Sequence, residues 1–190
     1  MKNLSKSELE SFLGPASIDG KKAIDTVNLP KNAHILDVGT GAGISAIFLA
    51  SIGYKVTTGE PATDSSEYAK MDWRANAIQF GVEKYISFRA FEAQQMPFND
   101  AFYDAVVFFG TLHHIDENAR TESITEAFRV CKPGGTVIFF EPTKETIKKV
   151  RERYPEHPVA ANPLLYIPSF CKIHMQKIEG AMMDIYILSA

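Results

Sequence analysis

Apolar strand-like segments alternate with helical patterns along most of this chain, and this alternation constrains the fold more than any other feature. It is typical of a parallel sheet whose two faces are covered by helices. The patterns predict strands at residues 33–38, 54–58, 86–90, 101–109 and 135–141, and helices at 18–29, 44–52, 65–80, 120–130 and 143–154. Residues 171–189 predict a hairpin that turns at Glu179 and Gly180. We therefore expect an α/β fold with a doubly wound, mostly parallel sheet.

A glycine-rich turn follows the first predicted strand. Glycines stand at positions 39, 41 and 43, where the backbone can bend sharply and a ligand can approach without meeting a Cβ. The helix that follows offers unpaired N–H groups. Asp37 lies just inside the turn, where its carboxylate would repel a phosphate and attract a cationic or zwitterionic ligand. The segment indicates a nucleotide-type site, and the simpler alternative is a plain strand-to-helix turn.

Two known glycine motifs are incomplete in this turn. The dinucleotide fingerprint requires a third glycine at the position of Ile44. The phosphate-loop motif ends in Gly-Lys-Ser or Gly-Lys-Thr, whereas Gly43 is followed by Ile44 and Ser45. An oxidoreductase with a nucleotide cofactor is therefore a weak alternative.

Length, charge and cysteine content exclude several classes. A chain of 190 residues fits one domain, and a net charge of −3 argues against a basic surface that holds nucleic acid. Cys131 and Cys171 lie far apart without zinc spacing, so we predict neither a disulfide scaffold nor a metal site. Residues 1–11 lack the apolar core of a signal peptide, and no segment is apolar enough to cross a membrane. A cytoplasmic protein is expected.

Four segments, in order, resemble motifs of the class I S-adenosylmethionine-dependent methyltransferases, of the type with a Leu-His-His-Ile turn. Residues 37–43 resemble the acidic residue followed by Gly-x-Gly-x-Gly, and 92–98 resemble acidic-Ala-x-x-Leu-Pro-Phe. Residues 112–115 read Leu-His-His-Ile, and 132–135 read Lys-Pro-Gly-Gly. The resemblance runs from residue 31 to the C-terminus. It implies a Rossmann-like sheet of seven strands with a C-terminal antiparallel hairpin, S-adenosylmethionine as cofactor, and methyl transfer.

The predicted cofactor site lies just after the strands, where open α/β sheets bind ligands. Glu60 ends the second strand and can accept hydrogen bonds from both ribose hydroxyls. Glu92 stands where the family has its adenine-recognising acid, usually an aspartate, so its longer side chain changes the reach. Pro61 or Ala62 could stack on the adenine. The resemblance implies a cradle of Asp37, Gly39, Thr40, Gly41, Ala42, Gly43, Glu60, Pro61, Glu92, Ala93, Gln94, Phe109 and Gly110.

His113, His114 and Glu141 are the candidate catalytic residues. The histidines lie where the acceptor should approach, and either could act as a general base or orient the substrate. Glu141 ends the fifth strand. A methyl group on a sulfonium is already activated, so in-line positioning supplies most of the chemistry. The simpler alternative is that one histidine ring packs and hydrogen-bonds to the backbone.

The sequence says less about the methyl acceptor and about the segment that covers the site. The chain lacks an Asn-Pro-Pro-Tyr tetrad after the fourth strand, which disfavours a nucleobase nitrogen and leaves a small-molecule acceptor. Residues 1–20, residues 154–168, a second copy in a homodimer or a large substrate could cover the site. We expect a single domain over residues 1–190: a helical segment at 1–30, a cofactor-binding core at 31–142, and a C-terminal helix and hairpin at 143–190. The alternative function is a methyltransferase-like module that binds the cofactor without transferring methyl groups.

Overall fold

Seven strands form one mixed sheet in the computed structural model, which describes residues 6–169 and 173–189. The strand order is β3-β2-β1-β4-β5-β7-β6, and β7 runs antiparallel to both of its neighbours while the other pairs are parallel. The strands are β1 (His34–Val38), β2 (Lys55–Gly59), β3 (Ile86–Phe88), β4 (Tyr103–Phe109), β5 (Cys131–Pro142), β6 (His174–Ile178) and β7 (Met183–Ser189). The predicted doubly wound sheet with a C-terminal hairpin is confirmed. Residues 1–5, 170–172 and 190 of the predicted segments lie outside the described residues.

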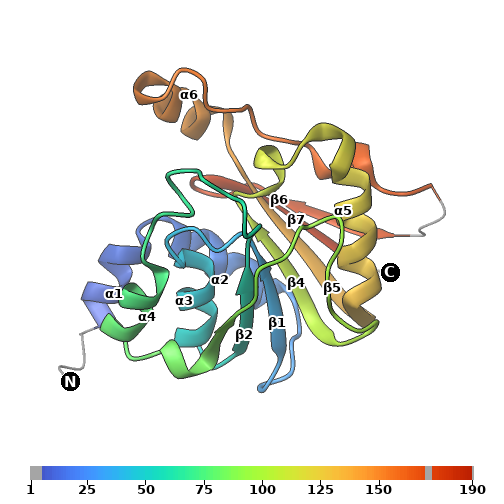
Figure 1. Ribbon diagram of the computed structural model, residues 1–190, viewed down its shortest axis with the longest axis horizontal. Coiled ribbons are helices and arrows are strands. Elements are labelled where there is room, and N and C mark those ends of the chain that lie inside the picture. Colours follow the sequence, from blue (N-terminus) through green and yellow to red (C-terminus); the bar gives the residue numbers. More distant parts are fainter. Residues whose placement is uncertain (1–5, 170–172, 190) are drawn as a thin grey trace.

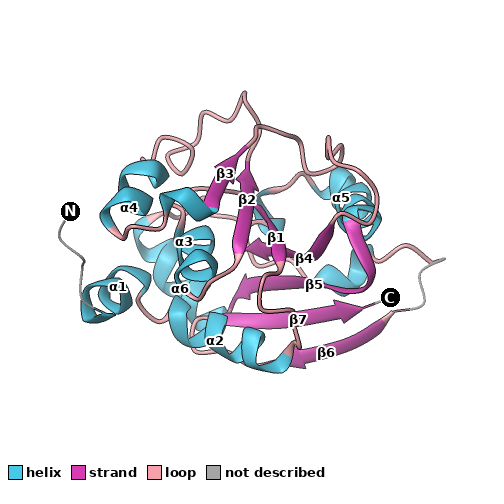
Figure 2. Ribbon diagram, turned by 90° about the horizontal axis from the view of Figure 1, so that it is seen from below, coloured by secondary structure: helices cyan, strands magenta, loops and turns pink. Residues whose placement is uncertain are grey.

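Helices cover both faces of this sheet (Figure 1). Helices α1 to α4 lie on one side and α5 lies on the other, an arrangement that Figure 2 shows from below. Helix α6 projects beyond the carboxyl ends of the strands. The helices are α1 (Lys6–Leu13), α2 (Ala16–Thr26), α3 (Ile44–Ser51), α4 (Trp73–Gln79), α5 (Glu117–Val130) and α6 (Lys144–Arg153), with short 3-10 helices η1 (Glu83–Tyr85), η2 (Leu112–His114) and η3 (Pro163–Tyr166). None of the helices in the described residues is long and apolar enough to cross a membrane.

The core has two halves, one on each face of the sheet. Side chains alternate between faces along a strand, so Ile35 packs in the half beneath α1 to α4 and the next residue, Leu36, packs in the half beneath α5. Both are fully buried. Burial on both faces is the reason that the central strands read as continuous apolar runs.

Three predicted helices differ from the observed ones by more than one residue at an end, and one of them, predicted at 120–130, begins earlier as α5, at Glu117. The helix predicted at 65–80 is wrong in its first half, since α4 begins only at Trp73. Asp64 accepts a hydrogen bond from the N–H of Ser66, and such local side-chain bonds compete with helix formation. Asp72 then caps α4 by accepting from the N–H of Ala75. The helix predicted at 18–29 begins earlier, at Ala16, and follows α1.

Asp19 fastens α2 to the turn between β6 and β7. Its buried carboxylate accepts hydrogen bonds from the backbone N–H groups of Ala181, Met182 and Met183, at 2.6, 2.8 and 2.9 Å. One side chain therefore satisfies three consecutive donors of the turn and holds the N-terminal helices against the last hairpin.

We predict that Asp19→Ala lowers the free energy of unfolding by about 2–4 kcal/mol, because three backbone donors lose a charged acceptor. Urea unfolding followed by circular dichroism measures the loss. Asp25→Ala is the matched control on the same helix. Its carboxylate forms an exposed pair with Lys21, so a change within about 0.5 kcal/mol is expected. Equal losses in the two variants would contradict the assignment.

Candidate cofactor and acceptor site

The site is built at the point where the strand order reverses. Strands β1 and β4 are neighbours in the sheet, yet the chain leaves them toward opposite edges, and ligands bind beyond the carboxyl ends of such strands. The glycine turn follows β1 and the histidine turn follows β4. Thr111 joins the two turns, since its hydroxyl donates to the carbonyl of Val38 at 2.8 Å. A Cβ on Gly39 would lie 2.5 Å from that hydroxyl oxygen, so this close contact requires glycine.

Asp37 is wholly buried at the end of β1. The hydroxyl of Thr58 donates to its Oδ2 atom at 2.8 Å and lies 3.0 Å from the hydroxyl of Thr40. Oδ1 has no hydrogen-bond partner among the described residues. Burial raises the pKa of this carboxyl to about 7, although the hydroxyls of Ser45 and Thr58 oppose the shift. Asp37 is therefore an incompletely satisfied acid that a cationic ligand group would stabilise in its ionised form.

Glu60, the residue predicted to bind the ribose, lies against the glycine turn. Its Oε2 atom accepts a hydrogen bond from the N–H of Gly41 at 3.0 Å. The residue is partly buried, and this burial raises the pKa of the carboxyl. The structure thus places the carboxylate of Glu60 against the backbone of the glycine turn, just beyond the ends of β1 and β2.

The segment predicted to hold the adenine is tied to Glu60 through the backbone. The N–H of Phe91 donates to the carbonyl of Glu60 at 3.1 Å. Ala93 is buried, whereas the side chains of Glu92 and Gln94 are exposed and free of the core. This arrangement lets the two exposed side chains face a ligand at the edge of the sheet.

The remaining predicted cradle residues lie at the same edge. Pro61 is partly buried and begins the loop that precedes α4. Phe109 ends β4, and Gly110 follows with a positive φ of 63°. The N–H of Gly110 donates to the carbonyl of Phe140 at 2.8 Å. Ala42 is anchored by Asn76, whose side chain donates to its carbonyl at 3.0 Å. The predicted cofactor residues, called the rim below, therefore lie at the carboxyl ends of β1, β2 and β4 and in the loops that follow β1 to β4.

The three candidate catalytic residues, His113, His114 and Glu141, also lie close together. Nδ1 of buried His113 lies 2.9 Å from Oε2 of buried Glu141. The same oxygen accepts a hydrogen bond from the N–H of Ala161 at 2.8 Å. His114 lies beside His113, with 4.3 Å between ring centroids, and has an exposed edge. Partial burial, followed by the neighbouring imidazoles of His113 and His157, lowers the pKa of His114 to about 4, so its ring is neutral at pH 7.

His157 belongs to this group and was missed by the sequence analysis. Its ring centroid lies 5.3 Å from that of His113 and 5.1 Å from that of His114. It comes from residues 154–168, which pass over the carboxyl end of β5 and are held by Glu141 and by a hydrogen bond from Arg120 to Tyr166. The sequence predicted this segment as a cover, but a single histidine among prolines carries no local signal of a site.

The other predicted cover, residues 1–20, is placed differently within its described part. Helix α1 packs on α2 and α3, and Leu13 at its end is buried in the core half beneath α1 to α4. Residues 6–13 therefore contribute to the core on that face of the sheet.

Comparison with known proteins agrees with this geometry. The family described as "Methyltransferase domain" matches residues 36–139, more than half of the chain. A demethylmenaquinone methyltransferase of Renibacterium salmoninarum is 27% identical over 145 residues, which cover 75% of this chain and 55% of that protein. The ubiquinone/menaquinone biosynthesis C-methyltransferase UbiE of Pseudomonas entomophila is 30% identical over 133 residues, covering 69% and 50%. The chain spans about half the length of the curated relatives that it matches.

Solved structures share the fold over nearly the whole chain. The PH0226 protein of Pyrococcus horikoshii superposes with a TM-score of 0.71 at 17% identity and covers 97% of this chain and 92% of its own. A SAM-dependent methyltransferase of Aquifex aeolicus gives 0.64 at 19% identity, with 98% and 100% covered. With the glycine turn, Asp37 and Glu60 in one rim, and with more than half of its length matched by the family, this chain belongs to the class I S-adenosylmethionine-dependent methyltransferases.

Proposed function

We propose that this chain is an active methyltransferase that binds S-adenosylmethionine at the glycine turn and transfers its methyl group to a small-molecule acceptor. The contact of Glu60 with the N–H of Gly41, beside buried Asp37, carries the proposal. The residues present fit the cofactor, because it needs an acid for its cationic amino-acid end, an acceptor for its ribose hydroxyls and close backbone approach at the turn.

Each part of the rim has one binding task in this proposal. Asp37, the backbone of residues 39–43 and the backbone at Phe109 and Gly110 hold the amino-acid end. Glu60 gives up its hydrogen bond with the N–H of Gly41 and accepts hydrogen bonds from the ribose hydroxyls instead. Pro61 packs on the adenine, and residues 92–94 bind its edge through the carboxylate of Glu92 and the backbone at Ala93 and Gln94.

The histidine turn serves the acceptor. When bound, the cofactor supplies an activated methyl group, so this chain must orient the acceptor atom and take its proton. Glu141 holds Nδ1 of His113, which leaves Nε2 of that ring to accept the proton. The names of the relatives, which include a demethylmenaquinone methyltransferase and a sterol 4-C-methyltransferase, favour a small organic acceptor.

The cover over the acceptor is residues 154–168 in this proposal, because they contact the histidine turn and Glu141. The division of a single domain into residues 1–30, 31–142 and 143–190, the homodimer and the cytoplasmic location stay predictions from the sequence. A module that binds the cofactor without catalysis is the alternative function, and turnover separates the two.

We predict that Glu60→Ala weakens binding of S-adenosylhomocysteine by about 10- to 100-fold. The variant loses a charged hydrogen-bond partner of the ribose, and such a loss costs roughly 1.5–3 kcal/mol of binding free energy. Calorimetric titration measures it, with NAD as a ligand that should not bind. The control is Glu67→Ala, because Glu67 lies in the next loop and its carboxylate is exposed in a pair with Lys70. Unchanged affinity in Glu60→Ala would refute the ribose assignment.

A second prediction concerns pH. A cation beside Asp37 needs the ionised carboxylate, and the pKa of about 7 in the ligand-free protein means that ionisation must accompany binding below pH 7. Affinity for S-adenosylhomocysteine should therefore fall by up to about tenfold per pH unit below 7 and level off above it. Asp37→Asn should bind weakly, with little dependence on pH. Titrations at several pH values test this, and a flat profile for the unmodified chain would contradict it.

The same carboxyl predicts how the stability of the ligand-free protein depends on pH. Its pKa is raised in the folded state, from 3.8 to about 7, so the contribution of this carboxyl to folding stability is largest at low pH and is lost as pH rises through this interval. Asp37→Asn should remove this loss and raise the melting temperature at pH 8 while it weakens ligand binding. A melting temperature that is lower than that of the unmodified chain at pH 8 would show that Asp37 is stabilising when ionised.

Turnover distinguishes the enzyme from the binding module. We expect release of S-adenosylhomocysteine when the chain is given S-adenosylmethionine with phenols, quinols or thiols. His113→Ala should lose most of this turnover and keep its affinity for S-adenosylhomocysteine. Tight cofactor binding without turnover on any of these acceptors would favour the module.

A further inference from the structure

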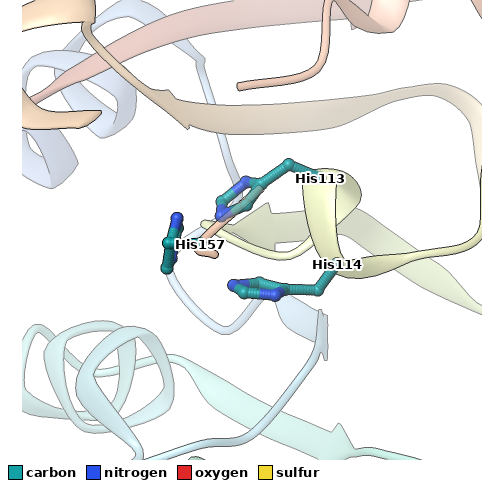
Figure 3. Close-up of side chains that lie close together, drawn as sticks. All are labelled: His113, His114 and His157. Carbon is teal, nitrogen blue, oxygen red and sulfur yellow. The ribbon is translucent and has the colours of Figure 1, made fainter. Parts of the chain in front are cut away.

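Three of the five histidines of this chain meet at the acceptor end of the site. One ring nitrogen from each of His113, His114 and His157 lies within 4.8 Å of the other two. Figure 3 shows the rings of His113 and His114 pointing toward His157, which comes from a segment distant in sequence. The cluster thus depends on the tertiary fold, since η2 supplies two rings and the loop after α6 supplies the third.

Hydrogen bonds set which nitrogen is free on two of these rings. Nδ1 of His113 faces Oε2 of Glu141, an oxygen that already accepts from the N–H of Ala161. Nδ1 of His157 faces the carbonyl oxygen of Pro158 at 2.9 Å. A carbonyl oxygen can only accept, and Oε2 is an acceptor here, so both Nδ1 atoms carry the hydrogen. In the neutral form of each ring, the lone pair is then on Nε2.

This pattern is that of metal-binding histidines. A ligating histidine commonly donates its other ring N–H to a carboxylate or a backbone carbonyl, which fixes the tautomer and the orientation of the ring. Glu141 and the carbonyl of Pro158 supply those two acceptors. Lone pairs on three ring nitrogens this close together repel each other, and a cation between the nitrogens removes that repulsion.

We propose that His113, His114 and His157 bind a divalent transition metal of the zinc type. Zinc binds histidine nitrogens at 2.0–2.1 Å in a tetrahedral arrangement, which places the nitrogens roughly 3.4 Å apart. The three nitrogens lie within 4.8 Å, so small rotations of the two more exposed rings, His114 and His157, close the site. Three nitrogen ligands leave a fourth position for water or substrate, as in catalytic zinc sites.

The position of the cluster suggests what the fourth ligand is. Thr111, just before η2, contacts Gly39 of the glycine turn, and Tyr68 lies between a Cβ position on Gly41 and the ring of His114. The metal would therefore lie next to the bound cofactor. An acceptor oxygen or sulfur on the metal would be held as the anion and face the methyl group, so in the metal-bound protein the metal would take over from Nε2 of His113 the task of removing the acceptor's proton. This role rests on the proposed function, whereas metal binding itself does not.

The test measures metal binding without any cofactor. The full chain is stripped with a chelator, dialysed and titrated with Co(II), whose visible absorption reports a tetrahedral nitrogen site, and then with Zn(II) in competition. We expect one equivalent of metal. His157→Ala and His114→Ala should each weaken binding at least tenfold, and Glu141→Gln should weaken it about 10- to 100-fold through the orientation of His113.

His174→Ala is the matched control, because His174 is an exposed histidine on β6; it should bind metal as the unmodified chain does. His157 and His114 lie in a loop and a surface turn, so their variants are expected to fold, which circular dichroism checks. No stoichiometric binding, or equal binding in His157→Ala and the unmodified chain, would overturn the proposal. Binding of S-adenosylhomocysteine in the same stripped protein is measured separately, so a failed metal site and a failed cofactor site give different results.

Discussion

The parallel pairing of β1 with β4 is the constraint on which the rest of the site depends. It aligns Val38 with Phe108, so the chain leaves both strands at the same level of the sheet. The glycine turn and the histidine turn then begin side by side, and the hydroxyl of Thr111 fastens them by donating to the carbonyl of Val38. Because this hydrogen bond joins the two turns, it restrains the predicted cofactor and acceptor parts of the site relative to each other.

Much of this architecture could be predicted because it is encoded locally. Apolar runs marked the central strands, and the glycines with Asp37 and Glu60 marked the edge where ligands bind. The loop before α4 was misread as helix, because Asp64 and Ser66 bond to nearby backbone N–H groups in place of the helical ones. His157 could not be found, since its role arises from a fold that brings two distant segments together.

Two buried acids, one on each of the strands that flank β4, show how a binding site can lower stability. Asp37 ends β1 and Glu141 lies near the end of β5, and each has one oxygen without a hydrogen-bond partner among the described residues. An unsatisfied buried acceptor destabilises a fold by about 1–3 kcal/mol. Sites that must bind a cation or orient a base keep such groups even though an apolar residue would pack better.

Glu141 also connects the proposed cover, residues 154–168, to the histidine turn. One carboxylate oxygen, Oε2, accepts from Nδ1 of His113 and from the N–H of Ala161 in the covering segment. Residues 154–168 therefore supply His157 to the cluster and, through the same oxygen of Glu141, are connected to the ring of His113. A methyl acceptor that displaced this segment would disturb both, so small acceptors that fit beneath it match the geometry better than large ones.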